Sequence, residues 1–116
     1  MHELPIIESA MNIALRHAET AGATKIVRIR LRVGALTELV DEWMQHYFSH
    51  LAKGTKAADA VLEIQWTPVV FRCADCEKTF SADIKKIDAI VCPRCAGANV
   101  ALLSGREFFV KDIEVA

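Results

Sequence analysis

The stretch KIVRIRLRVG, residues 25–34, decides the fold of most of this 116-residue chain, because apolar and basic side chains alternate along it. A period of two residues is the pattern of a β-strand with one buried face. The sequence therefore predicts a half-buried strand. Its apolar face comprises Val27, Ile29, Leu31 and Val33, and its polar face comprises Arg28, Arg30 and Arg32.

Helical patterns lie on both sides of this strand. Before it, apolar residues recur about once per helical turn, Pro5 suits a first turn and Gly22 offers a C-terminal stop. We expect a helix over about 5–21. After the strand, Asp41 is a candidate N-cap, and helical spacing of apolar residues predicts a second helix over about 41–53.

Two further segments, AVLEIQW at 60–66 and REFFVKDIEV at 106–115, predict strands. In the last strand the alternation slips at Lys111 and Asp112, as a bulge would make it do. Two strands alone are marginally stable, so the last strand should return beside the first two. The predicted fold class is α+β, a three-stranded sheet packed against two helices, with an inserted four-cysteine zinc-ribbon module.

The inserted module contains all four cysteines, in FRCADC and VCPRC. Two residues between cysteines let both thiolates of a turn point at one ion, and two such turns close a tetrahedron around Zn²⁺. Four protein ligands leave no open position, so this metal should be structural, and its binding energy replaces a missing core. The predicted zinc ligands are Cys73, Cys76, Cys92 and Cys95. We expect residues 1–68, completed by 106–116, to form one domain and 69–105 to form the inserted zinc-binding domain.

Two features of the cysteine turns leave questions open. The turn CPRC also occurs in rubredoxin-like iron sites; the sequence does not separate iron from zinc, and zinc is favoured because nothing else suggests electron transfer. Glycine often follows the second cysteine of such turns, where the backbone needs a positive φ. Here Glu77 and Ala96 occupy those places, and Gly97 comes one residue later.

Charge argues against nucleic-acid binding. The whole chain carries a net charge of −1, and residues 69–105 carry five basic and four acidic side chains. Four thiolates around one Zn²⁺ would make this module slightly negative, whereas phosphate binding requires a concentrated positive patch. The arginine face of the first strand should instead be paired across neighbouring strands. The acids placed to do so are Glu63 with Glu107, Asp112 or Glu114.

Other function classes find little support. No apolar run reaches the roughly eighteen residues of a membrane span, and the start is not a signal peptide, so we expect a soluble cytoplasmic protein. No nucleophile elbow or phosphate-binding glycine loop is present, so we expect no enzyme activity. His46 and His50 share a helix face at i, i+4 spacing but lack a nearby third ligand, which favours a solvent-facing pair. His17 is assigned no role.

The chain opens with MHELP, which suits metal binding if the α-amine is free. Removal of Met1 generally requires a small second residue, so we expect it to stay. Its amine nitrogen, the amide nitrogen of His2 and a ring nitrogen of His2 can form two fused chelate rings in one plane, which Ni²⁺ and Cu²⁺ accept. Glu3, water or a partner's ligand could complete the site. Leu4, before Pro5, favours an extended conformation, so this tip should project from the helix.

One physical objection stands against this chelate, because the N-terminal end of a helix carries about +0.5 charge and repels a divalent ion. Glu3 and Glu8 offset that charge in part. From the chemistry alone, an amino-terminal metal site and an ordinary disordered end both stay open.

The MHE start before an amphipathic helix, the two CxxC pairs and the closing GREFFVKDIEV together resemble the HypA/HybF family of hydrogenase nickel-insertion proteins over nearly the whole chain. The resemblance implies a nickel metallochaperone that binds Ni²⁺ transiently through Met1 and His2, with Glu3 involved, and binds zinc through the four cysteines. It also implies work with the accessory GTPase HypB and delivery to the large subunit of [NiFe] hydrogenase. Some members also serve urease maturation.

Two departures from the family pattern limit what the resemblance implies. Residues 69–105 contain no histidine, so a zinc-module histidine that reaches nickel or exchanges with a cysteine cannot be assigned. The segment around Val40 also lacks the proline that many relatives place before the second helix. A zinc-ribbon module that binds RNA or a protein, without any nickel function, is the alternative from another class.

Overall fold

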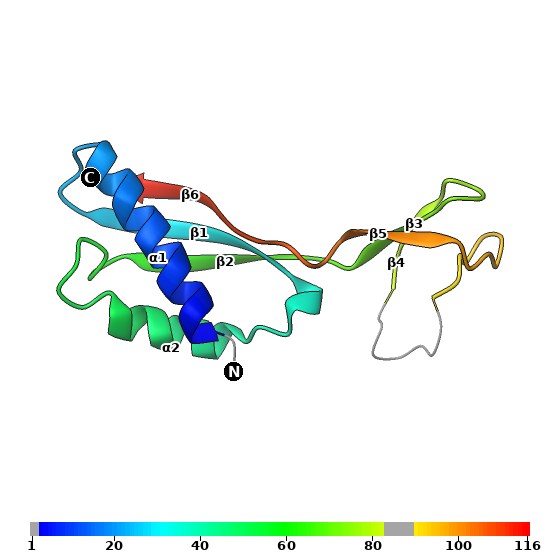
Figure 1. Cartoon of the computed structure of the whole chain (residues 1–116), viewed down its shortest axis with the longest axis horizontal. Helices are drawn as coiled ribbons and strands as arrows, with labels where there is room; N and C mark the ends of the chain where they lie inside the picture. Colours follow the sequence, from blue (N-terminus) through cyan, green and yellow to red (C-terminus); the bar gives the residue numbers. More distant parts are fainter. Residues whose placement is uncertain (1–2, 83–89) are drawn as a thin grey trace. The chain divides into compact units, whose positions relative to one another are not determined.

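The computed structural model of the chain describes residues 3–82 and 90–116. These residues form two compact units (Figure 1), and each is described by itself. The described residues of the first unit are 3–32, 38–65 and 108–116, and those of the second are 33–37, 66–82 and 90–107. The second unit thus includes Val33–Thr37, which the sequence analysis placed in the first domain.

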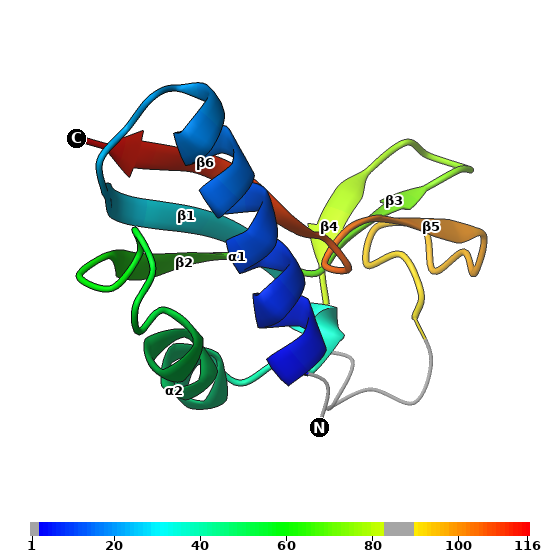
Figure 2. The ribbon, with the colours of Figure 1, turned by 60° about the vertical axis from the view of Figure 1, so that its left-hand side comes forward.

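A three-stranded sheet forms the centre of the first unit, in the strand order β2-β1-β6. Its strands are β1 (Ile26–Gly34), β2 (Val61–Thr67) and β6 (Phe108–Val115). Helices α1 (Glu3–Thr20) and α2 (Asp41–Leu51) pack against each other and cover one face of this sheet (Figures 1 and 2). The predicted α+β arrangement, with the last strand returning to the first, is confirmed.

Apolar side chains from both helices and the sheet form the core of the first unit. The buried set includes Ile7, Met11, Ala14, Ile29, Leu31, Met44, Phe48 and Leu62. One position on the predicted apolar face of the first strand is wrong, because Val27 is 36% exposed. Alternation assigns a residue to a face, but it does not say where the elements covering that face end.

Helix α1 begins at Glu3, two residues before the predicted start. The position of Leu4 before Pro5 predicts an extended conformation, but both residues lie in the first turn of the helix. Proline is tolerated there because the first four N–H groups of a helix have no intrahelical acceptor. The positive end of the helix dipole also favours an acidic side chain at this position. Glu3 therefore belongs to the helix and not to a projecting tip.

The C-terminal end of α1 agrees with the prediction that Gly22 stops the helix. Gly22 has φ +68°, and its N–H donates to the carbonyl of Glu19 at 3.0 Å. The N–H of Ala23 donates to the carbonyl of Ala18, also at 3.0 Å. These two bonds form a Schellman motif, which satisfies carbonyl groups that the helix end leaves without partners.

Helix α2 is shorter than predicted, and its cap differs. Val40 is the N-cap, in an extended conformation and without a side-chain cap hydrogen bond, and Asp41 is the first helical residue. There the Asp41 carboxylate complements the helix dipole and accepts a hydrogen bond from Gln45 at 3.2 Å. The helix ends at Leu51. No helix among the described residues has the length and apolar character that crossing a membrane requires.

The arginine face of β1 is paired with acids on both neighbouring strands, as predicted. Arg28 lies 2.9 Å from Glu63 on β2, and Arg30 lies 2.7 Å from Asp112 on β6. Arg30 also contacts Glu63 at 3.3 Å, and both arginines contact Glu114 at longer distances. Single exposed ion pairs contribute little to stability. A network across three strands instead favours one register, because a slip by one residue would turn every partner to the other face.

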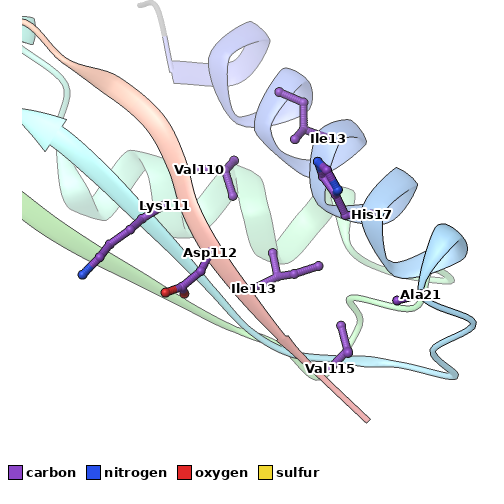
Figure 3. A pocket seen from close by; sticks show the side chains of 8 residues that line it. All are labelled: Ile13, His17, Ala21, Val110, Lys111, Asp112, Ile113 and Val115. Atoms are coloured by element: carbon purple, nitrogen blue, oxygen red, sulfur yellow. The ribbon is translucent and has the colours of Figure 1, made fainter.

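Strand β6 changes phase where the sequence predicts a slip. All four residues from Val110 to Ile113 border the groove beside α1, but the side chains of Lys111 and Asp112 point away from that helix, whereas those of Val110 and Ile113 point toward it (Figure 3). Lys111 donates a hydrogen bond to Gln65 at 3.2 Å, on the same sheet face as the arginine network. Two consecutive side chains on one face are the mark of a β-bulge. The predicted slip is confirmed.

The second unit contains a sheet of its own, which the sequence analysis did not predict. Its strands, in the order β4-β3-β5, are β3 (Val70–Cys73), β4 (Thr79–Ser81) and β5 (Val100–Ser104), and both pairings are antiparallel. Phe71 faces Phe80 across β3 and β4, and their rings stack with centroids 5.8 Å apart. The short 3-10 helix η1 (Ala35–Thr37) also belongs to this unit.

Two glycines of the second unit allow a close backbone approach. A Cβ atom on Gly34 would overlap the carbonyl group of Gly105. The N–H of Gly34 donates to the carbonyl of Glu107, and the N–H of Leu36 donates to that of Gly105, both at 2.7 Å. The two segments therefore lie backbone to backbone, with room for hydrogen atoms only.

Substituting Gly34→Ala should destabilise the second unit by about 2 kcal/mol or more, because the methyl group forces these backbones apart. Urea unfolding measures the effect. The comparison variant is Gly54→Ala, at φ +76° with open space around it, which should lose only about 1 kcal/mol. Equal losses in the two variants would show that the close approach does not matter.

The pKa of Glu63 is lowered, chiefly by the hydrogen bond from Gln65, against the opposing effect of burial, with Arg28 and Arg30 contributing. Because its folded pKa is depressed, Glu63 stabilises the fold above the unfolded value of about 4.5. That contribution is lost as the pH falls through the folded pKa. Glu63→Gln should therefore reduce stability at pH 7 and show a smaller loss on acidification. Urea unfolding at about pH 7 and pH 4, with exposed Glu8→Gln as control, tests this.

Candidate metal centre

The four cysteines lie on two turns of the second unit. Cys73 is the last residue of β3, and Cys76 lies in the turn that leads to β4. Cys92 and Cys95 belong to a second turn, before β5. Cys73 and Cys92 are fully buried, Cys76 is half-buried and Cys95 is exposed. The structure brings together all four predicted ligands, although Cys76 and Cys92 are sixteen positions apart in the sequence.

The two turns have the same backbone hydrogen bonds. In each, the first cysteine donates its N–H to a carbonyl five residues ahead, at 2.9 Å. Its own carbonyl accepts from the N–H four residues ahead, at 2.8 Å. The acceptor residues are Lys78 and Gly97, and the donor residues are Glu77 and Ala96. This repeated geometry explains why two residues between cysteines place both sulfur atoms on the same side of a turn.

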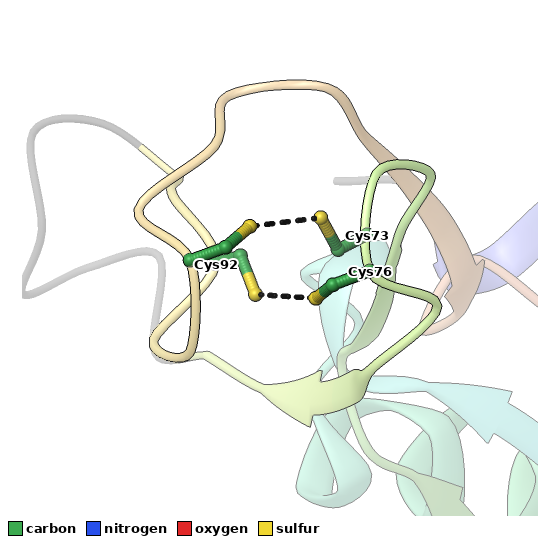
Figure 4. Close-up of side chains that lie close together, drawn as sticks. Cys73, Cys76 and Cys92 are labelled. Atoms are coloured by element: carbon green, nitrogen blue, oxygen red, sulfur yellow. Dashed lines mark hydrogen bonds between the residues drawn. The ribbon is translucent and has the colours of Figure 1, made fainter.

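The sulfur atoms of the two turns face one another (Figure 4). All four lie within 4.8 Å, with Cys73 3.6 Å from Cys95 and Cys76 3.5 Å from Cys92. A tetrahedron with metal–sulfur bonds of 2.3 Å has sulfur atoms about 3.8 Å apart. A disulfide would need about 2.05 Å, and all four cysteines are free. The cluster therefore fits one tetrahedrally bound metal ion.

The thiols also influence one another's ionisation. Burial raises the pKa of Cys92, but the backbone N–H groups of Cys95 and Arg94 outweigh it and lower the pKa to about 7. The N–H of Gly97 lowers the pKa of Cys95, but the Cys73 thiol and burial outweigh it and raise the pKa to about 12. Four adjacent thiolates need a cation to offset their charge, so metal binding must release protons.

Glu77 and Ala96 have the backbone conformation for which these turns usually use glycine. Their φ angles are +64° and +59°. A side chain in the left-handed region costs about 1–2 kcal/mol relative to glycine. The departure noted in the sequence is therefore a real strain at both turns. A closed metal site that holds the turns in place can offset it.

Within residues 3–82 and 90–116, the cysteines are the one group of three or more potential metal ligands that lie together. His46 and His50 are exposed on α2, as predicted, and lie outside that group. His17 is exposed near the end of α1 and lines a groove of about 440 Å³ between α1 and β6 (Figure 3). The groove is mainly apolar, and Lys111 and Asp112, which also border it, point away from the helix that carries His17 (Figure 3).

The predicted amino-terminal site is described only at Glu3. Met1 and His2 lie outside the described residues. The Glu3 side chain is 5% exposed, the one buried charged side chain among the described residues. This burial differs from the expectation that Glu3 belongs to a tip projecting from the helix. The signal in the sequence that Glu3 is helical is its acidic side chain at the start of an amphipathic pattern, because acidic residues are enriched in the first turn of helices.

Replacing Ala96 with glycine should relieve the strain at the second cysteine turn and stabilise the metal-loaded second unit by about 1 kcal/mol. The measurement is the urea concentration at which the protein releases its metal to a chromogenic chelator. Exposed Ala98, two residues away and without a positive φ, provides the control Ala98→Gly, which should give no gain. A loss of metal at lower urea in both variants would contradict the proposed strain.

Comparisons with known proteins agree with this architecture. The family model described as "Hydrogenase/urease nickel incorporation, metallochaperone, hypA" matches residues 1–115. A hydrogenase maturation factor HypA of Dehalococcoides mccartyi is 39% identical over 99% of this chain and 94% of its own length. Another, of a Picosynechococcus species, is 36% identical over 99% of both chains.

Two solved structures have the same fold. The solution structure of the Ni metallochaperone HypA from Helicobacter pylori has a TM-score of 0.67 and 26% identity, and covers 99% of this chain and 97% of its own. A second solution structure of a HypA protein has a TM-score of 0.75 at 26% identity, and covers 100% of this chain and 97% of its own. The chain therefore belongs to the HypA family of hydrogenase and urease nickel-incorporation metallochaperones.

Proposed function

We propose that this chain carries Ni²⁺ at its amino terminus, through Met1, His2 and Glu3, and helps to insert it into the large subunit of [NiFe] hydrogenase. The single observation that carries the proposal is the family match over residues 1–115, which includes the MHE start. Nickel is the cargo of this process. The protein supplies ligands and releases the ion, and no bond of a substrate is made or broken.

The chemistry of the first residues supports this assignment. An amine, a deprotonated amide and an imidazole give three nitrogen ligands in one plane, which suits Ni²⁺. The first N–H groups of an α-helix have no intrahelical acceptor, so a chelate at the start of a helix such as α1, which begins at Glu3, competes with no backbone hydrogen bond of that helix. An open or weak fourth position lets an acceptor ligand enter before the donor ligands leave. The site therefore suits transfer better than storage.

Glu3 offsets the main objection to a cation at this end of α1. The helix N-terminus carries about +0.5 charge, and the structure places the Glu3 carboxylate in the first turn. The low exposure of Glu3 strengthens its electrostatic effect, because the field is screened less than in water. Glu3 thus lowers the cost of holding Ni²⁺ there, whether its carboxylate binds the ion directly or through water.

We propose zinc as the resident metal of the four cysteines. Zinc forms closed tetrahedral thiolate sites, and the sulfur spacing fits its bond length. Bound zinc would supply the energy that holds Cys73, Cys76, Cys92 and Cys95 in place and would perform no catalysis. An iron-loaded, red protein would refute zinc and favour the rubredoxin-like alternative.

The family assignment also suggests the partners. We propose that the chain acts with the accessory GTPase HypB before it reaches the hydrogenase large subunit, with urease maturation as a further use. The cytoplasm is the proposed site of this work, because four free thiols persist there in reduced form. The alternative, a zinc-ribbon module that binds a protein or nucleic acid, predicts no specific nickel site at the amino terminus.

A calorimetric Ni²⁺ titration of tag-free, zinc-loaded protein tests the proposal. The wild-type chain should bind one nickel ion tightly, whereas His2→Ala and a chain extended by one residue before Met1 should lose that event. Both variants leave the cysteines unchanged, so each should still contain one zinc per chain by elemental analysis. Equal tight binding by all three proteins would refute the amino-terminal site and leave the interaction-module alternative.

A further inference from the structure

We infer that His46 and His50 form a second, weaker transition-metal site on the exposed face of α2. Histidines four residues apart lie one helical turn apart on one face, with Cβ atoms about 5–6 Å from each other. One ion can therefore bind both rings. Imidazole nitrogen suits Ni²⁺, Cu²⁺ and Zn²⁺. This site is separate from the cysteine cluster and does not depend on the proposed amino-terminal site.

The two rings are accessible without any change in the core. His46 and His50 are exposed, whereas Met44 and Phe48, on the opposite side of α2, are 0% and 5% exposed. Metal binding therefore needs no unfolding and no movement of α2. Neither histidine belongs to the buried core, and the ring contacts among the described residues of α2 involve His46 but not His50, so His50 can be replaced without disturbing the core side of the helix.

Neighbouring aromatic rings restrict the His46 side chain. The Trp43 ring meets it edge-on, with centroids 6.0 Å apart and planes at 90°. The Tyr47 ring lies 5.5 Å from it at 66°, and Trp43 and Tyr47 stack against each other at 6.0 Å and 26°. A ring already held in position loses less conformational entropy when it binds a ligand. This arrangement also places a fluorescent indole directly beside the proposed ion.

The electrostatic field of α2 favours a cation at this position. His50 lies in the last turn of the helix, where the carbonyl groups carry about −0.5 charge. Glu42, one turn before His46 and also exposed, adds a negative charge on the same side. Lys53, just after the helix, opposes it. The dipole that disfavours a cation at the start of α1 therefore favours one here.

Two imidazoles leave the remaining coordination positions to water, so the ion should bind weakly and exchange quickly. The chelate nevertheless binds more tightly than a single histidine, because the second imidazole is held at high effective concentration. Such a site can collect nickel on the protein surface without competing with a three-nitrogen chelate. It would appear in a nickel titration as a second, weaker event.

Trp43 fluorescence tests this inference with NiCl₂ as the probe. The parent protein is the zinc-loaded full chain with Trp66→Phe, which leaves Trp43 as the one indole, and with His2→Ala, which removes the proposed amino-terminal site. Nickel should quench Trp43 saturably in this parent. The added substitution His50→Gln should weaken the quenching affinity by about tenfold or more, because it removes one arm of the chelate.

A matched control keeps the number of histidines constant. His50→Gln combined with Lys53→His moves the second imidazole beyond the end of α2, seven residues from His46, so the two rings no longer share the i, i+4 spacing that lets them bind one ion. This variant should bind as weakly as His50→Gln alone. Quenching equal to that of the parent in both variants, or no saturable quenching up to about 1 mM nickel, would overturn the inference. Circular dichroism confirms that each variant is folded.

Discussion

Strand β1 is the constraint on which the first unit depends, because its two faces meet different requirements. Its apolar face, with Ile29 and Leu31 fully buried, packs under both helices. Its other face carries Arg28 and Arg30, which meet acids of β2 on one side and of β6 on the other. Burial favours the correct face, and charge pairing favours the correct register across strands that are distant in sequence. Neither burial nor charge pairing by itself would select β6 as the strand that pairs with β1 opposite β2.

The second unit is organised around the four-cysteine cluster in place of a large apolar core. Its sheet contributes one stacked phenylalanine pair and a few buried side chains, which is little for an independent unit. The two cysteine turns even carry strain at Glu77 and Ala96, where φ is positive. A tetrathiolate metal can compensate for both deficits, because its binding energy is also folding energy. With a metal bound, these two positive-φ positions would not need to be glycine.

The metal sites proposed for this chain have opposite tasks. Sulfur ligands from four cysteines close a tetrahedron and suit permanent retention. Nitrogen ligands of the proposed amino-terminal and α2 sites leave positions open and suit exchange. The helix dipoles have opposite effects on a cation at these two proposed sites. The start of α1 disfavours a cation, so that site needs Glu3 nearby, whereas the end of α2 favours a cation. With these sites, one small protein can retain one metal ion and deliver another, because the two ions bind different kinds of ligand.

The sequence by itself determined the element types, the four-cysteine cluster and the bulge at Lys111, because periodicity and ligand spacing are local properties of the chain. It also indicated the family, through the order of its motifs. Only the tertiary structure decided that Val27 and Trp66 are exposed, that Glu3 is a buried helical residue, and that the ribbon builds its own sheet. These outcomes depend on which segments cover one another. Such long-range contacts leave no periodic signal in the residues concerned.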